Sequence, residues 1–334
     1  MIEWFSRCNT QADLKEEKTV LQEGVHMIYS NVLEAVGNTP LIELKRMESP
    51  EGARILAKYE AVNIGGSIKT RTALQMIEGA EKKGLLHKGS TIVEATSGNQ
   101  GIGLALVGAV KGYKVIIIMP DSVSEERRRL VQQYGAKVRL VHDEGNIGEC
   151  INRCLAMARQ LHEDNDYFLP GQFQNEDNVA AHYLHTRKEI LEQVNGPVDG
   201  FCCGFGTGGT ITGIGRALKE KNPEITIIAA EPEHAAILSG GEVGDHIQMG
   251  IGDGVIPPIL DQSIISGLMT VTDEQALQTS QRLAAEEGLL CGISSGTNVY
   301  AAMKLAEKLG RGKTVVTVLP DTGERYFSTP LFNK

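Results

Sequence analysis

The 334-residue sequence predicts an α/β fold with two domains, each an open, mostly parallel sheet flanked by helices. Three observations predict this class. Short apolar runs alternate with segments of helical period from Arg54 onward. Glycine-rich turns stand where strands are followed by helices. The length is also sufficient for two cores, at about 150 residues per domain.

In the first half, strands are expected at 54–59, 91–95, 114–120 and 137–141. The runs TIVEA and KVIIIMP are continuous rather than alternating, which is typical of strands buried on both faces of a parallel sheet. Residues 72–84, 101–112 and 124–135 have helical period and fill the spaces between strands.

In the second half, strands are expected at 200–204, 226–232 and 314–320, with a helix from Thr210 and a long helix over 272–288. Thr272 and Gln275 predict a capping box for that long helix. Turn-forming residues cluster at 170–178, where we expect the linker. The expected divisions are therefore an N-terminal extension over 1–30, a mobile N-terminal domain over 31–172 and a C-terminal domain over 173–334.

Charge and cysteine spacing indicate which partners, metals and compartments to expect for this chain. The net charge of −9 argues against binding to nucleic acid or anionic membranes. The six cysteines form no CxxC pair and no zinc spacing, so no metal site is expected. The first residues lack the pattern of a signal peptide, and the expected location is the cytoplasm. The basic cluster Arg127, Arg128 and Arg129 is interpreted as a solvated helix face.

Three glycine-rich turns are the candidate functional segments, at 63–69, 96–100 and 204–210. In the third, backbone N–H groups and a helix N-terminus would bind a phosphate, with Thr207 and Thr210 as hydroxyl donors. This turn also fits G-x-G-x-x-G, with Glu231 about 20 residues further on, as a dinucleotide site requires. An alternative is that these glycines only permit tight packing.

The first turn ends in Lys69, which becomes a nucleophilic amine if it is desolvated, or is otherwise an ordinary surface lysine. The second turn offers hydroxyl, amide and backbone donors suited to a carboxylate, or else only caps a helix. A nucleophilic lysine, a phosphate site and a carboxylate site are together what pyridoxal phosphate and an amino acid need.

Eight motifs in order resemble the β-family (fold type II) pyridoxal-phosphate enzymes, in particular the cysteine synthases and cystathionine β-synthases. The resemblance covers about residues 30–334. The motifs are VGNTPLIEL (36–44), NIGGSIKTR (63–71), EATSGNQGIGLAL (94–106), GQFQN (171–175), GTGGTITGIGRAL (206–218), GIGDGVIP (250–257), GISSGTN (292–298) and LPDTGERY (319–326).

The resemblance implies a cofactor in the cleft between the domains and a role for each matching residue. Lys69, in the N-terminal domain, would hold the cofactor as a Schiff base. Asn99 would bond its ring hydroxyl oxygen, and Ser294 would face its pyridine nitrogen. The phosphate would lie in a turn of the C-terminal domain made of Gly206, Thr207, Gly208, Gly209 and Thr210. The substrate carboxylate would be held by Thr96, Ser97, Gln100 and Gln172.

The implied reaction is β-replacement through an aminoacrylate, in which O-acetylserine or O-phosphoserine and sulfide give L-cysteine. Lys69 would move the α-proton. A homodimer is also implied. Alternatives within the family are a cysteine β-lyase or an amine-using β-substitution enzyme. From other classes, an NAD-binding oxidoreductase and a catalytically silent regulatory partner remain open.

This chain departs from the usual family motifs at several positions. Ile64, Thr70, Ala95 and Gln100 replace the more common proline, aspartate, proline and threonine. Asp253 stands where many sulfhydrylases have alanine. We expect Asp253 either to transfer a proton as a second catalytic residue or to be a solvated loop acid.

Overall fold

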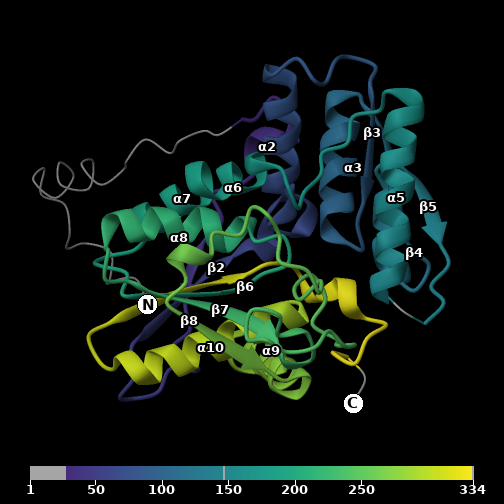
Figure 1. Cartoon of the computed structure of the whole chain (residues 1–334). Coiled ribbons are helices and arrows are strands. Elements are labelled where there is room, and N and C mark those ends of the chain that lie inside the picture. Colours follow the sequence, from purple (N-terminus) through teal and green to yellow (C-terminus); the bar gives the residue numbers. More distant parts are fainter. Residues whose placement is uncertain (1–27, 146, 333–334) are drawn as a thin grey trace, which may run out of the picture.

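The computed structural model describes residues 28–145 and 147–332, and within them the strands form two separate sheets (Figure 1). One sheet has three strands in the order β3-β4-β5 and the other has six in the order β1-β2-β9-β6-β7-β8. Helices flank both sheets, which confirms the predicted α/β class. Most of the predicted extension lies outside the described residues.

The smaller sheet consists of the parallel strands β3 (Thr91–Ala95), β4 (Lys114–Pro120) and β5 (Lys137–Val141). Helices α2 (Lys69–Lys82), α3 (Asn99–Lys111) and α4 (Glu125–Gln133) share an apolar cluster with one face. Helix α5 (Ile147–Asn165) packs on the other face. Ile117 points to the first cluster and Ile116 and Ile118 to the second, which explains why the β4 run is continuously apolar.

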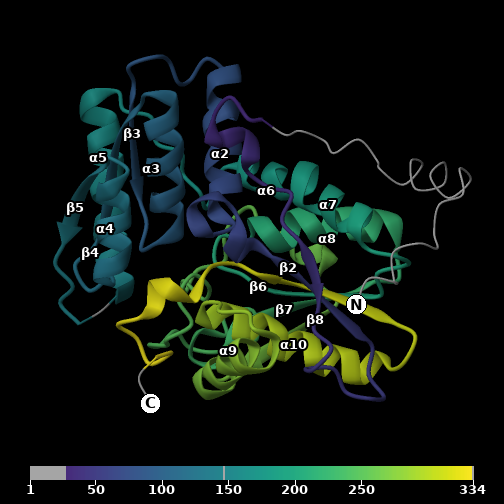
Figure 2. The ribbon, with the colours of Figure 1, turned by 180° about the vertical axis from the view of Figure 1, so that it is seen from behind.

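The larger sheet is parallel except for its first strand. Here β1 (Leu41–Glu43) runs antiparallel to β2 (Arg54–Tyr59), and the other strands are β6 (Gly200–Gly204), β7 (Thr226–Pro232), β8 (Gly267–Val271) and β9 (Thr314–Leu319). Helices α7 (Arg187–Gln193) and α8 (Gly209–Lys221) lie on one side, and α9 (Asp273–Glu287) and α10 (Ile293–Leu309) on the other (Figure 2). Cys202 faces the α10 side and Cys203 the α8 side.

Shorter elements complete the fold. Helix α6 (Glu176–Ala181) continues through a π-helical turn, His182–Thr186, into α7. Single 3₁₀ turns lie at Val32–Ala35, Glu60–Val62, Ile64–Gly66, Glu233–Ala235, Gln262–Ile264 and Gly323–Tyr326. No described helix has an apolar stretch long enough to cross a membrane.

The predicted capping box at the start of α9 is confirmed. The Thr272 hydroxyl oxygen accepts a bond from the Gln275 N–H at 3.1 Å, and the Gln275 side chain accepts one from the Thr272 N–H at 3.0 Å. The helix ends at Gly288, whose φ of +73° is the left-handed conformation that favours glycine.

The sheets do not follow the expected division at residue 172. Strand β2 lies far before that residue, yet it pairs with β9 along its whole length, from Arg54 beside Thr314 to Tyr59 beside Leu319. The reason is that Ile55 and Ala57 pack into the cluster on the α10 side of the large sheet, while Leu56 packs on the α8 side. The first two strands of the chain, β1 and β2, therefore belong to the large sheet, and the small sheet forms only after them.

Candidate active site

One cleft is lined by all three glycine-rich turns, with walls from both sheets. Its floor includes the carboxyl ends of β3 and β6, where open α/β sheets place their ligands. Every predicted site residue except Gly209 lines it. These are Lys69, Thr96, Ser97, Asn99, Gln100, Gln172, Gly206, Thr207, Gly208, Thr210, Asp253 and Ser294.

Lys69 is the first residue of α2 and faces the cleft. Its amine makes no hydrogen bond or ion pair with another described residue. Burial lowers the pKa of Lys69 from its ordinary value, against the opposing influence of Asp253 and Cys203. A larger fraction of the amine is therefore neutral and nucleophilic.

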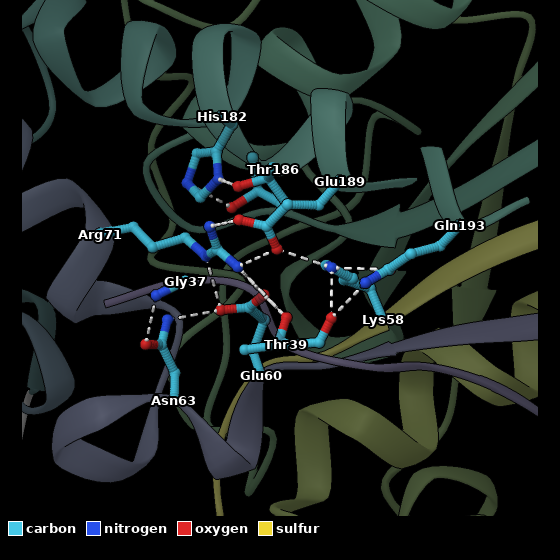
Figure 3. Close-up of polar contacts among 11 residues, drawn as sticks. Gly37, Thr39, Lys58, Glu60, Asn63, Arg71, His182, Thr186, Glu189 and Gln193 are labelled. Carbon is cyan, nitrogen blue, oxygen red and sulfur yellow. Dashed lines mark hydrogen bonds and ion pairs between the residues drawn. The ribbon is translucent and has the colours of Figure 1, made fainter. Parts of the chain in front are cut away.

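A buried ionic network holds the start of α2, two residues after Lys69 (Figure 3). The Arg71 guanidinium donates to both carboxylate oxygens of Glu60, at 2.9 and 2.8 Å, and to both of Glu189, at 2.6 and 2.7 Å. Lys58, on β2, lies 2.7 Å from Glu189. The two cations and two anions balance, and they join α2 to the large sheet and to α7.

The third turn has a shape that only glycine permits. Gly208 caps α8 with a φ of +82°. A Cβ on Gly209 would lie 2.1 Å from the Asn178 amide oxygen. The first N–H groups of α8 have no partner within the helix, and Gly208, which lines the cleft, has no side chain to cover them, as a phosphate site requires.

Hydroxyl groups of this turn are held from behind. The Asn178 amide nitrogen donates to the Thr207 hydroxyl oxygen at 2.9 Å, so the Thr207 O–H is left to donate elsewhere. Thr210 lies 3.2 Å from His182 Nε2, and His182 Nδ1 lies 3.0 Å from Thr186. Burial lowers the pKa of His182 well below its ordinary value, which keeps the ring neutral.

The second turn begins α3 and contains an unsatisfied donor. The Gln100 side chain is buried, and its oxygen accepts a bond from the Thr72 hydroxyl at 2.7 Å. Its amide nitrogen has no partner among the described residues. Because a buried unpaired donor is costly, this nitrogen fits a ligand oxygen in the cleft.

Glu94 holds the backbone of Gln172, which lines the same cleft as the turn 96–100. Its carboxylate accepts bonds from the N–H groups of Gly171, at 3.0 Å, and Gln172, at 3.4 Å. Burial raises the pKa of Glu94 to about 7, although the backbone N–H donors oppose this. Sequence interpretation missed this residue, although an acidic side chain within the apolar run TIVEA was a usable signal.

The other predicted site residues, Asn99, Ser294 and Asp253, line different parts of the cleft. The Asn99 amide donates to Asp321 at 2.6 Å and accepts a bond from Arg325. Ser294 is buried in the first turn of α10. Asp253 lies against the turn 204–210, since a Cβ on Gly206 would be 2.7 Å from its carboxylate. Burial raises the pKa of Asp253, opposed by the charge of Lys69.

These residues fit pyridoxal phosphate. The glycine turn with free N–H groups suits the phosphate, the unbonded Lys69 amine suits the aldehyde, and the unpaired Gln100 nitrogen suits a carboxylate. Glu231, the acidic residue that a dinucleotide site would need, is already occupied. Its carboxylate accepts bonds from the N–H and hydroxyl groups of Ser239 and from the N–H of Leu238.

The expectation that Arg127, Arg128 and Arg129 form a solvated helix face is wrong for Arg127. The predicted solvated face holds for Arg129, but Arg127 is only 4% exposed and lines the cleft. Helix α4 turns this side chain inward onto the ring of Tyr326, 5.1 Å from the ring centre. Tyr326 is far along the sequence, so no local pattern marks the contact.

Comparisons with known proteins agree with the site. A family model described as pyridoxal-phosphate dependent enzyme matches residues 32–321. The cysteine synthase of Staphylococcus aureus (strain Mu50 / ATCC 700699) is 47% identical over 304 residues, covering 91% of this chain and 97% of that protein.

Two solved structures are also similar. O-ureido-L-serine synthase is 42% identical with a TM-score of 0.87, over 92% of this chain and 96% of that one. The O-acetylserine dependent cystathionine beta-synthase from Helicobacter pylori is 37% identical with a TM-score of 0.86, over 92% and 99%. With Lys69 and the turns 96–100 and 204–210 in one cleft, this chain belongs to the family of pyridoxal-phosphate dependent enzymes.

Proposed function

We propose that this chain is a cysteine synthase, which replaces the β-substituent of O-acetylserine with sulfide to give L-cysteine. The observation that carries the proposal is the placement of an unbonded Lys69 amine and the unpaired Gln100 nitrogen in the same cleft as the phosphate turn. The similarity to cysteine synthases over most of the chain supports the same reaction.

The cofactor supplies the electronic part of the chemistry. When bound, pyridoxal phosphate withdraws electrons from the α-carbon of an attached amino acid, which allows a leaving group on the β-carbon to depart. Gly206, Thr207, Gly208, Gly209 and Thr210 would hold its phosphate. Asn99 and Ser294 would contact its ring.

Lys69 is proposed to hold the cofactor covalently and then to act as the general base. Burial lowers the pKa of its amine, so the released amine is able to accept the α-proton near neutral pH. The same amine returns a proton to the α-carbon after the new bond forms. The Arg71 network keeps the backbone of this turn in place during both transfers.

Thr96, Ser97, Gln100 and Gln172 are proposed to bind the substrate carboxylate. The turn stands at the N-terminus of α3, whose free N–H groups favour an anion. Glu94 holds the backbone of Gln172 toward the same point.

Asp253 favours a second candidate function within the family, a β-lyase or an amine-using enzyme. Its carboxylate lies at the phosphate turn and influences Lys69, so a role in activating water or an amine is open to it. Sulfide needs no such activation. The nucleophile therefore distinguishes the two candidates.

The test is a kinetic comparison of wild type with Asp253→Asn. The proposed function predicts cysteine formation from O-acetyl-L-serine and sulfide, lost in Lys69→Ala and changed by less than about tenfold in Asp253→Asn. Assays with O-phospho-L-serine identify the leaving group. If no cysteine forms from either donor, the proposal is wrong; if cysteine is instead broken down to pyruvate and Asp253→Asn abolishes that, the second candidate is favoured.

Assembly and location are further parts of the proposal. We infer a homodimer acting on small molecules in the cytoplasm, without nucleic acid. The described cysteines are all free and buried, as suits a reducing compartment. A sedimentation experiment at micromolar concentration that gave only the monomer mass would refute the dimer.

A further inference from the structure

Arg127 is a buried cation in the cleft wall, and no described residue is its anionic partner. It is the third residue of α4, and its guanidinium Nε is inaccessible and makes no hydrogen bond with a described residue. Nη1 lies 3.1 Å from the sulfur of Met249, which is a weak acceptor. Within the described ranges, no carboxylate lies within ion-pair distance of this side chain.

The contrast with Arg71 shows how unusual this environment is. Arg71 is equally buried, but two glutamates neutralise it and satisfy its donors. Arg127 has instead the ring of Tyr326, 5.1 Å from the guanidinium carbon. A cation–π contact stabilises a cation but does not supply a counter-charge.

The charges around Arg127 leave a positive excess in this wall. Arg325 is its cationic neighbour, and the influence of Arg127 is one cause of a lowered pKa at Arg325, after burial. Asp321 is the nearby carboxylate, and one of its oxygens already accepts bonds from Asn99, at 2.6 Å, and the Tyr326 hydroxyl, at 2.8 Å. This wall therefore holds two guanidinium groups and one carboxylate, and among the described residues neither guanidinium lies within ion-pair distance of that carboxylate. An uncompensated buried charge is costly, so this wall is suited to an anionic ligand.

The guanidinium of Arg127 lies beside the turn 96–100. Nε, Cδ and Cζ of Arg127 lie 3.4–3.5 Å from where a Cβ of Gly98 would be. Gly98 is the middle residue of the turn 96–100, in which the Gln100 amide nitrogen is also unpaired. Both unsatisfied donors thus stand beside the N-terminus of α3.

We propose that Arg127 is a specificity-determining residue that binds the α-carboxylate of the amino acid substrate, next to the turn 96–100. This inference rests on the proposed function, which supplies the amino acid. The guanidinium provides the charge, and the turn provides the N–H and hydroxyl donors. Substrates with a neutral group in place of the carboxylate are then rejected, because Arg127 would remain buried and unpaired.

The test measures binding rather than turnover. The holoenzyme is titrated in a calorimeter with L-serine and with L-serinamide, which lacks the carboxylate charge. Arg127→Met is compared with Arg129→Met, a matched control that removes the same charge from the exposed side of α4. We expect Arg127→Met to weaken L-serine binding roughly ten- to hundredfold, the value of a charge-assisted bond, and to leave L-serinamide binding nearly unchanged. Arg129→Met should change neither, and Arg127→Lys should recover part of the loss.

Three results would overturn the proposal. An equal loss for both ligands would show that Arg127 only packs the turn, and unchanged L-serine binding would show that it does not contact the carboxylate. Wild-type protein that bound no L-serine would also contradict it. Cofactor content and cysteine formation measured on the same preparations report separately on the proposed function.

Discussion

Replacing Glu189 with glutamine is expected to lower the free energy of unfolding by about 3 kcal/mol at neutral pH. Burial raises the pKa of the Glu189 carboxyl, but the hydrogen bonds and charges of Arg71 and Lys58 outweigh it and hold the pKa at about 2. Each pH unit between folded and unfolded pKa is worth about 1.4 kcal/mol. The fall from 4.5 to about 2 therefore corresponds to about 3 kcal/mol. Loss of one partner from a buried ion pair costs about the same.

The pH dependence has a definite sign. A carboxyl whose pKa is depressed in the folded state contributes its full stability above the unfolded value of 4.5 and loses it as the pH falls toward 2. The gap between wild type and Glu189→Gln should thus be constant from pH 7 to about 5 and shrink below 4.5.

The assay is urea unfolding followed by circular dichroism at several pH values. The control is Glu125→Gln, which removes a carboxylate from an exposed pair with Arg129 and should cost less than about 1 kcal/mol. If Glu189→Gln costs no more than this control, or if its cost does not change below pH 4.5, the network of Arg71 and Glu189 does not stabilise the fold in this way.

Three other substitutions test separate parts of the structure. Glu94→Gln places an amide among backbone N–H donors and should raise KM for the amino acid at every pH. The wild-type KM should rise only as the pH falls through about 7, because Glu94 then gains a proton. A wild-type KM that does not vary with pH would contradict this. Because the pKa of Glu94 is raised in the folded state, its ionisation costs stability as the pH rises from 4.5 to about 7, and Glu94→Gln should remove that trend in urea unfolding. Thr272→Ala should cost about 1 kcal/mol in thermal unfolding through loss of the capping box, with KM unchanged. Gln100→Thr should change the preference among β-substituted serines while cofactor content stays constant, and identical preferences would show that Gln100 does not contact the substrate.

The fold was predictable because local patterns carried it. The uninterrupted run of β4 is apolar on both faces since α3 covers one and α5 the other, and the sequence shows this directly. The capping box of α9 was visible for the same reason, because Thr272 and Gln275 are three residues apart. The pairing of β2 with β9 was not, since it joins segments about 260 residues apart and no local pattern encodes it.

In the candidate site, too, residues in local motifs were predictable and residues that depend on distant contacts were not. Lys69, the turn 96–100 and the turn 204–210 were predictable because each is a short contiguous motif, and the structure places all three in one cleft. Arg127 and Glu94 were not identified, because their roles depend on distant partners. Arg127 depends on Tyr326 and Met249, and only the folded chain shows that this arginine lacks a carboxylate.

Lys69 is proposed to hold pyridoxal phosphate in this cleft. The most direct measurement is borohydride reduction of the purified, yellow holoenzyme, followed by peptide mass spectrometry. We expect the yellow colour to be lost and the mass of the reduced cofactor to be found on the peptide containing Lys69, with no such mass in Lys69→Ala. A cofactor mass on a different lysine, or a colourless protein that gains no mass, would contradict it.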